Sequence, residues 1–241
     1  MSQISNRPVS YIVGGQDFEG QLLFDAAVQQ PRPGLLMAPN WMGIGDGAIE
    51  IAKQVVAQGY VVFIADLYGE GVRPQDATAA SAAMMTVIDK AGALRQRMQA
   101  ALETFKAQPD VALDTSRLAA FGFCFGGHCA LELARSGAAL RASVSFHGTL
   151  STQDPADEKN IQGAVLVLDG ASDPLVPRTQ LTDFAAEMTA VNVDWQLTSY
   201  GGACHSFTDP QANVPGKMQY DAKIAKRAFA AMYALLDEVF A

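Results

Sequence analysis

Apolar and polar positions follow two periodicities, one typical of strands and one of helices, along this chain of 241 residues. Residues 9–14 and 20–28 predict a hairpin-like pair of strands at the edge of a sheet. After them, short apolar runs typical of buried parallel strands alternate with longer segments of helical period. This order predicts an α/β fold, in which a mostly parallel, doubly wound sheet is flanked by helices and has an antiparallel N-terminal edge.

The expected elements fill most of the remaining chain. Strands are expected at residues 35–38, 60–65, 117–121, 141–146, 163–168 and 193–199. Helices are expected at residues 46–57, 78–107, 124–136, 178–190 and 219–239, with a break near Gly92 in the second of them. Asp46 is a plausible N-cap for the first helix, and Gly137 ends the third. No repeat or long linker divides the chain, so we expect a single domain, residues 1–241.

Cys124 lies in a Gly-x-Cys-x-Gly-Gly turn between an apolar strand and a helix. A nucleophile elbow turns so tightly that the positions two before and two after the nucleophile can hardly carry a Cβ atom, and here they are Gly122 and Gly126. The turn would lift the sulfur clear of the sheet to the N-terminus of the helix, where the helix dipole favours a thiolate. The alternative is a buried structural cysteine in a glycine-rich turn.

An acid and a base follow Cys124 in the order that this type of site uses. Asp173 comes just after the buried strand that ends near Gly170, and His205 lies in a glycine-rich loop after the next strand. Because the carboxyl ends of parallel strands share one edge of a sheet, we expect all three side chains to meet there. His205 would then activate Cys124, and Asp173 would orient the imidazole.

These segments resemble the dienelactone hydrolase family of α/β-hydrolases. The resemblance rests on the cysteine turn, on Asp173 before Pro174, on the run 205–208, on the loops 38–43 and 65–68, and on the end of the last helix. It implies the α/β-hydrolase fold and hydrolysis of an ester or lactone through a thioester acyl-enzyme. It also implies an oxyanion hole formed by the backbone N–H groups of Trp41 and Phe125.

Two positions that we expect in the substrate pocket, Asn40 and Asp209, depart from the pattern of the family. Asn40 stands where dienelactone hydrolases carry a glutamate that pairs with the resting cysteine, so activation of Cys124 should depend more on His205. Asp209 stands where the best-known members place an arginine that binds a substrate carboxylate. No arginine for this role occurs in residues 76–85, and Arg73 lies near that segment in the sequence. The resemblance therefore implies that a carboxylate-bearing dienelactone is not the preferred substrate.

Composition limits the partners and the location. Hydrophobic residues make up 49% of the chain, yet no uninterrupted apolar run approaches the roughly 18 residues that span a membrane. The first seven residues lack the apolar core of a signal peptide, and three cysteines make no disulfide framework, so we expect a cytoplasmic protein. A net charge of −8 argues against nucleic acid. We expect a small-molecule substrate, no membrane partner, no cofactor or metal, and a monomer or homodimer.

Several residues leave alternatives open. His147, at the end of a strand, either lines the substrate pocket or is a satisfied structural residue. Phe207 is expected to be a pocket wall, with the core as its alternative. Cys204 adjoins His205 and gives a second function class, a thiol redox or peroxide-handling protein in which Cys204 resolves Cys124, although no CxxC motif is present. A non-catalytic ligand binder on a hydrolase fold is the third class.

Overall fold

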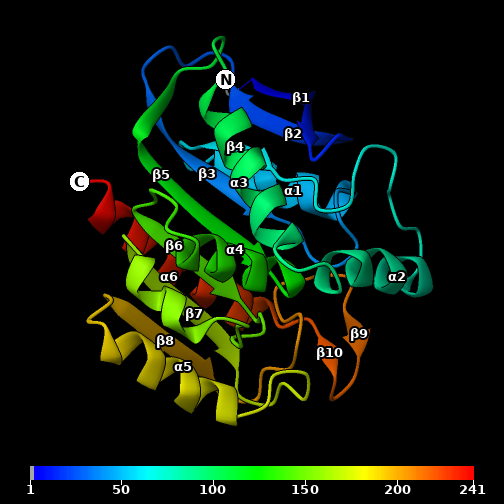
Figure 1. Ribbon diagram of the computed structural model, residues 1–241, viewed down its shortest axis with the longest axis vertical. Coiled ribbons are helices and arrows are strands. Elements are labelled where there is room, and N and C mark those ends of the chain that lie inside the picture. Colours follow the sequence, from blue (N-terminus) through cyan, green and yellow to red (C-terminus); the bar gives the residue numbers. More distant parts are fainter. Residues whose placement is uncertain (1–2) are drawn as a thin grey trace. The chain divides into compact units, whose positions relative to one another are not determined.

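The N-terminal half of the chain carries the antiparallel edge of the sheet (Figure 1). Its strands are β1 (Ile4–Val13), β2 (Gln16–Asp25), β3 (Arg32–Ala38) and β4 (Val61–Ile64), and its helices are α1 (Asp46–Val56), α2 (Ala77–Ile88) and α3 (Ala93–Lys106). Strand β2 pairs antiparallel with both β1 and β4, whereas β3 and β4 are parallel. The structure, a computed structural model, describes residues 3–241.

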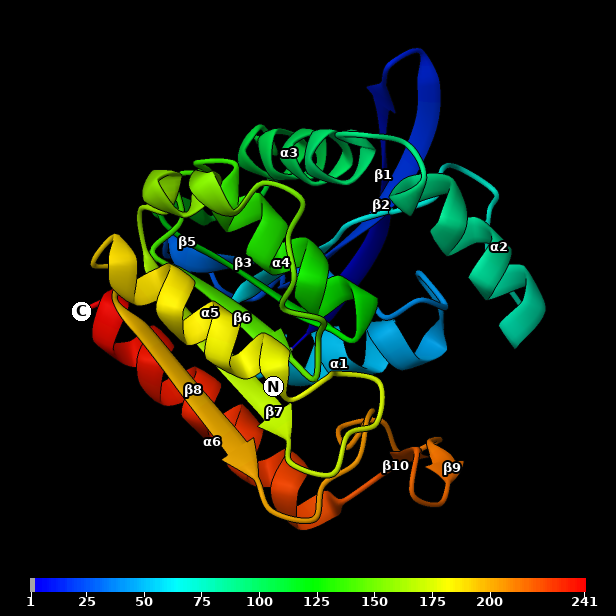
Figure 2. The same cartoon turned by 60° about the horizontal axis from the view of Figure 1, so that its bottom comes forward.

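The C-terminal half contains the regular alternation of strands and helices. Its elements are β5 (Leu113–Phe123), α4 (Phe125–Arg135), β6 (Ala142–Phe146), a 3-10 helix (Pro155–Asn160), β7 (Ala164–Gly170), α5 (Thr179–Ala190), β8 (Trp195–Tyr200), β9 (Asn213–Val214), β10 (Met218–Gln219) and α6 (Ala222–Val239). The pairs β6–β7 and β7–β8 are parallel. Helices α4 and α5 lie on one face of β6–β8 and α6 lies on the other (Figure 2), as a doubly wound sheet requires.

The eight long strands are ordered β1-β2-β4-β3-β5-β6-β7-β8. The prediction of a mostly parallel sheet with an antiparallel N-terminal edge is therefore confirmed. The chain also divides into two compact units, residues 1–120 and 121–241, and the boundary falls inside β5. The single domain expected from the sequence stays a prediction.

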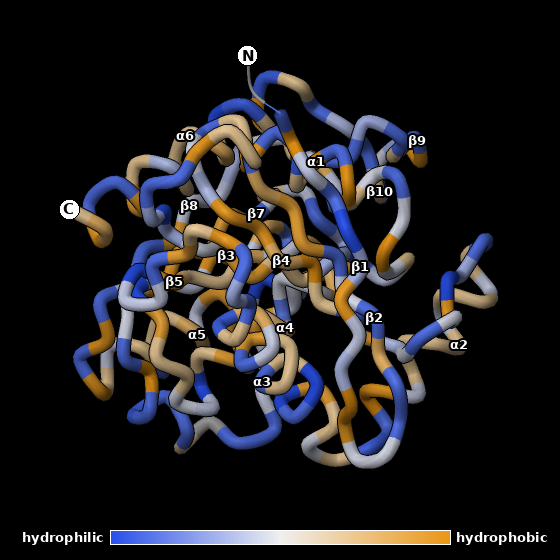
Figure 3. The backbone as a smooth tube through the Cα atoms, turned by 90° about the horizontal axis from the view of Figure 1, so that it is seen from above, coloured by the Kyte–Doolittle hydropathy of each residue, from blue (hydrophilic) through white to orange (hydrophobic). Residues whose placement is uncertain are grey.

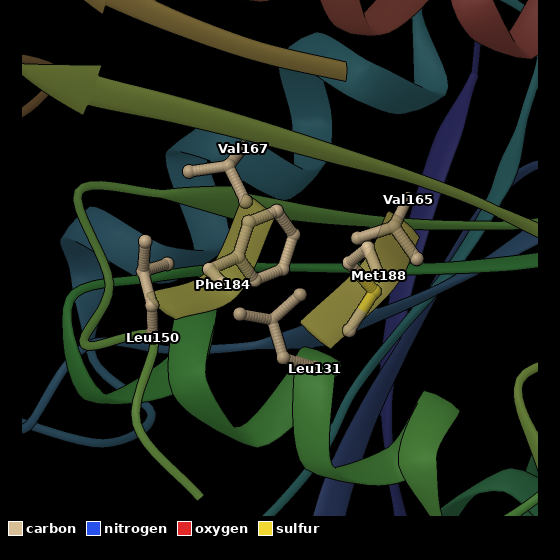
Figure 4. Close-up of a cluster of buried hydrophobic side chains, with 6 residues drawn as sticks. All are labelled: Leu131, Leu150, Val165, Val167, Phe184 and Met188. Atoms are coloured by element: carbon tan, nitrogen blue, oxygen red, sulfur yellow. The ribbon is translucent and has the colours of Figure 1, made fainter. Parts of the chain in front are cut away.

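Buried strands carry continuous apolar runs because helices cover both of their faces. Strands β3, β4 and β7 stand out as hydrophobic in Figure 3, and every residue of β4 and β7 is buried. In the C-terminal unit, α4 and α5 pack on β7 through one apolar cluster (Figure 4). The members of this cluster are Leu131, Leu150, Val165, Val167, Phe184 and Met188. Complete burial of one such side chain stabilises the fold by about 1.5–3 kcal/mol.

Some predicted boundaries were wrong. Asp46 is not the N-cap of α1, because the extended residue before the helix is Gly45 and Asp46 is the first helical residue, where its charge suits the helix dipole. Helix α6 begins three residues later than predicted, since the side chain of Asp221 caps it by accepting a hydrogen bond from the Ile224 N–H. The short pair β9–β10 and the 3-10 helix were not predicted.

Candidate active site

Cys124 occupies a strained turn between β5 and α4. Its backbone has φ 55° and ψ −120°, a conformation that L-residues rarely adopt. Its N–H donates to the Phe146 oxygen at the end of β6, 3.0 Å away, and its carbonyl oxygen accepts from the N–H groups of Gly127 and His128. Cys124 is partly exposed, whereas its neighbours on both sides are buried. The turn thus presents the side chain of Cys124 at the N-terminus of α4.

Glycines allow α4 to approach β6 closely enough for this turn. A Cβ atom on Gly127 would lie 2.5 Å from the Ser145 Oγ, and one on Gly148 would lie 2.8 Å from the His128 backbone nitrogen. Real Cβ atoms do not approach backbone this closely, so either substitution would push the helix away from the strand. The sequence motif pointed to Gly122 and Gly126, whereas the need for glycine at 127 and 148 was not predicted.

Asp173 and His205 meet as the sequence predicts. Asp173 follows β7 and is 5% exposed, and its Oδ2 lies 2.7 Å from the Nδ1 of His205. The other oxygen of the carboxylate accepts from the Leu175 N–H at 2.8 Å, which fixes the orientation of the carboxylate. His205 is 3% exposed. Because Asp173 accepts from Nδ1–H, the neutral imidazole presents an unprotonated Nε2.

The loop that carries His205 is held by β10. The His205 N–H donates to the Lys217 oxygen at 3.0 Å, and the His205 oxygen accepts from the Gln219 N–H at 2.9 Å. The next residue, Ser206, has φ 56°. The small hairpin that was not predicted is therefore the element that positions the histidine.

The pKa of His205 is raised to about 9. Burial alone would lower it, but the hydrogen bond with Asp173 and the interaction with Cys124 outweigh burial. The Nε2 atom itself is buried and makes no hydrogen bond of ordinary geometry within residues 3–241. It is therefore the atom of this imidazole that is left to exchange a proton with a thiol, a substrate or water.

His147 is buried next to this pair. It is 3% exposed, its Nδ1 accepts from the Cys124 N–H at 3.2 Å, and its Nε2 lies 2.8 Å from the Thr208 Oγ1. Both ring nitrogens are thus engaged within the protein. Of the two alternatives for His147, these contacts favour the structural one over a wall of the substrate pocket.

Both proposed oxyanion donors have N–H groups that are available. Phe125 is the first residue of α4, so its N–H has no acceptor within the helix, and it has none elsewhere in the described part of the chain. In the N-terminal unit, the Trp41 N–H likewise has no acceptor among the described residues, while the Trp41 oxygen accepts from the Tyr68 hydroxyl at 2.7 Å.

The remaining predicted pocket residues have local contacts. Phe207 is 0% exposed and packs edge-on against His147, with ring centroids 5.0 Å apart. The Asp209 Oδ1 accepts from the Gln211 N–H, and the Asn40 Oδ1 accepts from the Met42 N–H, both at 2.9 Å. Each of these polar side chains therefore stabilises its own turn.

Arg73 is committed to other groups in the N-terminal unit. Its guanidinium donates to the carbonyl oxygens of Glu19, Gly69 and Val72, and lies 3.5 Å from the Asp66 carboxylate. These contacts fix the loop after β4 and leave Arg73 with little freedom to bind a substrate carboxylate.

All three cysteines are free thiols. Cys129 is completely buried, and burial raises the pKa of its thiol well above the usual value. Cys204 is buried beside His205. Residues 3–241 contain no group of three or more His, Cys, Asp or Glu side chains arranged to hold a metal ion. None of the described helices has the length and apolar character needed to cross a membrane.

A cavity of about 450 Å³ lies at the opposite edge of β6–β8, near the residues that precede the strands. Arg141, Gly163 and Asp194 are among the residues that line it. None of the predicted site residues lines this cavity, so it is separate from the candidate site at Cys124 and His205.

Comparisons with known proteins agree with the fold and give its family. The sequence model of the dienelactone hydrolase family matches residues 18–240. The uncharacterized protein K02A2.1 of Caenorhabditis elegans is 40% identical over 161 residues, which are 64% of this chain and 98% of that protein. The solved structure named m3DLH is 41% identical, has a TM-score of 0.92 and covers 99% of both chains. A dienelactone hydrolase-like promiscuous phosphotriesterase from metagenomic libraries is 38% identical, with a TM-score of 0.91 and 98% of both chains covered.

Proposed function

Because this chain belongs to the dienelactone hydrolase family of hydrolases, we propose that it hydrolyses an ester or lactone with a Cys124–His205–Asp173 triad. The observation that carries this proposal is the buried contact of 2.7 Å between Asp173 and His205, combined with the effect of Cys124 on the pKa of the same imidazole. A cysteine, an imidazole and an orienting carboxylate are the three groups that nucleophilic acyl transfer requires.

The first half of the proposed reaction forms a thioester. The Cys124 thiolate attacks the carbonyl carbon, and the carbonyl oxygen becomes an oxyanion that accepts hydrogen bonds from the N–H groups of Phe125 and Trp41. Collapse of this intermediate breaks the bond to the alcohol oxygen, and the His205 imidazolium gives its Nε2 proton to the leaving alkoxide. Loss of one oxyanion donor typically raises the barrier by about 3 kcal/mol.

The second half releases the acid. Neutral His205 takes a proton from water, and the hydroxide attacks the thioester carbon. The carbon–sulfur bond then breaks, so Cys124 leaves as a thiolate beside the imidazolium. Asp173 holds the Nδ1–H throughout and stabilises the cation without taking its proton.

We infer a neutral substrate from the charges near the histidine. Asp209, four residues after His205, places a carboxylate where the resemblance would put an arginine, and Arg73 is bound to Asp66 and to three carbonyl oxygens. A small neutral ester or lactone fits these charges better than a carboxylate-bearing one. A thiolate nucleophile also suits a reducing compartment, so we place the protein in the cytoplasm, as a monomer or homodimer without nucleic acid.

The test is to trap the acyl-enzyme. Incubation with a slowly hydrolysed p-nitrophenyl ester should add the acyl mass to Cys124, and Cys124→Ala should abolish turnover while the protein stays folded. Cys129→Ala is the matched control. Turnover by Cys124→Ala, or acyl mass only on Cys129 or Cys204, would overturn the proposal. A wild type that shows neither turnover nor acylation would favour the non-catalytic binder instead.

Cys204→Ser separates the hydrolase from the redox alternative. A hydrolase should keep most of its esterase activity in this variant and should need no added thiol. Peroxide turnover that depends on both Cys124 and Cys204 and that exceeds ester cleavage would favour the redox function instead.

A second candidate substrate class is neutral phosphotriesters, because the phosphotriesterase described above is 38% identical over nearly the whole chain. The Cys124 thiolate would attack phosphorus, the leaving aryloxide would take the proton of His205, and water would cleave the sulfur–phosphorus bond. Assay with a neutral aryl phosphotriester tests this class, and dependence of its turnover on Cys124 is the expected result.

A further inference from the structure

His147 sits in a strained backbone conformation at the end of β6. Its φ is 40°, a value that is uncommon for residues other than glycine. Four non-glycine residues between residues 3 and 241 have positive φ, and three of them are Cys124, His147 and Ser206. Strain of this kind persists where surrounding contacts over-determine the conformation, and it concentrates at functional sites. His147 therefore shares its backbone strain with the proposed nucleophile, Cys124, and with Ser206, the residue after the proposed catalytic histidine.

The hydrogen bonds of His147 define its tautomer. Because the Cys124 N–H donates to Nδ1, this nitrogen carries no hydrogen. The hydrogen of the neutral ring is therefore on Nε2, which donates to the Thr208 Oγ1 at 2.8 Å. One neutral imidazole thus connects the backbone of the nucleophile to the loop that carries His205, three residues before Thr208.

The surroundings of His147 favour the neutral ring on balance, although a hydrogen bond with its own backbone raises its pKa. Its ring lies edge-on to His205, with centroids 5.1 Å apart, and it also contacts the rings of Phe123 and Phe207. Burial and the charge of His205 lower the pKa of His147 well below its usual value. No carboxylate within residues 3–241 forms an ion pair with it. At neutral pH, His205 is therefore the charged histidine of this pair and His147 is the neutral one.

We propose that His147 is a positioning residue of the triad, which aligns the Cys124 sulfur and the His205 ring by joining the Cys124 backbone and the Thr208 side chain, in the loop of His205, to one neutral imidazole. This inference rests on the proposed function. The Cys124 N–H is anchored at two acceptors, the Phe146 oxygen and His147 Nδ1, so the direction of the Cα–Cβ bond is fixed. The Thr208 contact fixes the loop of His205 relative to the same ring.

If His147 positions the triad, its loss should slow the chemical step more than it weakens substrate binding. A misplacement of about 1 Å between reacting groups can lower a rate about 100-fold. His147→Phe keeps an aromatic ring but removes both hydrogen bonds, so kcat should fall about 100-fold while KM changes less than about threefold. His147→Asn should recover part of this loss, because its amide oxygen can replace Nδ1 as an acceptor and asparagine tolerates positive φ.

Thr208→Val tests the other end of the connection. It should lower kcat about tenfold, and the double variant His147→Phe/Thr208→Val should be no slower than His147→Phe, since both changes remove the same connection. Phe184→Leu, in the apolar cluster between α5 and β7, is the control for lost packing and should leave kcat unchanged. Additive effects of His147→Phe and Thr208→Val would overturn the inference.

One further measurement and one comparison of variants separate this inference from the proposed function. In the wild-type enzyme, ¹⁵N NMR of the histidine rings should show His147 as the neutral Nε2–H tautomer at pH 6.5, the ordinary pKa of a histidine. A ring with its hydrogen on Nδ1, or a cationic ring at this pH, would overturn the inference. If Cys124→Ala is inactive but His147→Phe keeps the wild-type kcat, only this inference fails. If Cys124→Ala keeps turnover, the proposed function itself fails.

Discussion

Asp66 and Asp173 are two buried carboxylates with different partners. In the N-terminal unit, Asp66 follows β4 and accepts from the N–H groups of Glu19, Tyr68 and Gly69 at 3.0–3.1 Å, with Arg73 at 3.5 Å. In the C-terminal unit, Asp173 follows β7 and accepts from one backbone N–H and from the His205 Nδ1. Asp66 is surrounded by donors that do not titrate near neutral pH, so it can only hold a loop. Asp173 faces the His205 imidazole, which can gain and lose a proton, so Asp173 can influence proton transfer.

Replacement of aspartate by asparagine should therefore mainly lower activity at position 173 and mainly lower stability at position 66. Asp173→Asn should lower kcat/KM about 10⁴-fold, because the amide no longer selects the Nδ1–H tautomer of His205 or stabilises the imidazolium. The fold should persist, as circular dichroism and thermal unfolding would show. Activity within tenfold of the wild type would mean that Asp173 only holds its loop, as Asp66 does.

Asp66→Asn should mainly lower stability. Its NH₂ group would face backbone donors and the ion pair with Arg73 would be lost, so the free energy of unfolding should fall by about 2–3 kcal/mol. Turnover per folded molecule should stay within about threefold of the wild type. Urea unfolding and kinetics on the same preparation measure both quantities. A loss of turnover comparable to that of Asp173→Asn would break the distinction.

The pH dependence sharpens the contrast at His205. The pKa of His205 is about 9, and in the proposed mechanism its imidazolium is the acid for the leaving group, so kcat/KM should fall about tenfold per pH unit above 9. Asp173→Asn should move the limb to lower pH, because Asp173 raises the pKa. Asp66→Asn should leave it in place.

The same shift affects folding. A group whose pKa is raised on folding contributes stability that is complete below its ordinary value, 6.5, and that disappears as the pH rises through about 9. A wild-type enzyme whose alkaline limb lies near 6.5 would show that His205 gains no such stabilisation.

The smallest expected effect concerns Asp209. Its Oδ1 caps a local turn, so Asp209→Asn keeps that hydrogen bond and removes only the charge. The wild type should cleave neutral esters with higher kcat/KM than carboxylate-bearing analogues of similar shape, and Asp209→Asn should narrow this preference about threefold, since solvent screens a half-buried charge. Paired assays of the two analogues measure it. A wild-type preference for the anionic analogue would contradict the charge argument.

Much of the site could be predicted because it depends on chain order. Cys124, Asp173 and His205 each follow a strand that the apolar pattern identifies, and parallel strands bring such positions to one edge of a sheet. The antiparallel edge and the helices were predicted from periodicity in the same way. The N-cap at Asp46 was wrong because a residue type alone does not reveal which residue leaves the helical conformation.

The remaining features depend on packing between segments distant in sequence. β10 has two residues, too few for a periodic signal, yet it holds the loop of His205. The hydrogen bonds of His147 to Cys124 and Thr208 join three separate segments, so only its position at a strand end hinted at a role. The need for glycine at 127 and 148 likewise comes from the approach of α4 to β6.

The strained turn at Cys124 has a consequence for how the sequence can change. At φ 55° and ψ −120° a glycine is comfortable and a side chain is not. Cys124→Gly would therefore relieve backbone strain, and under the proposed mechanism it would remove the nucleophile in the same step. Laboratory evolution of this protein for thermal stability should therefore be coupled to an activity screen.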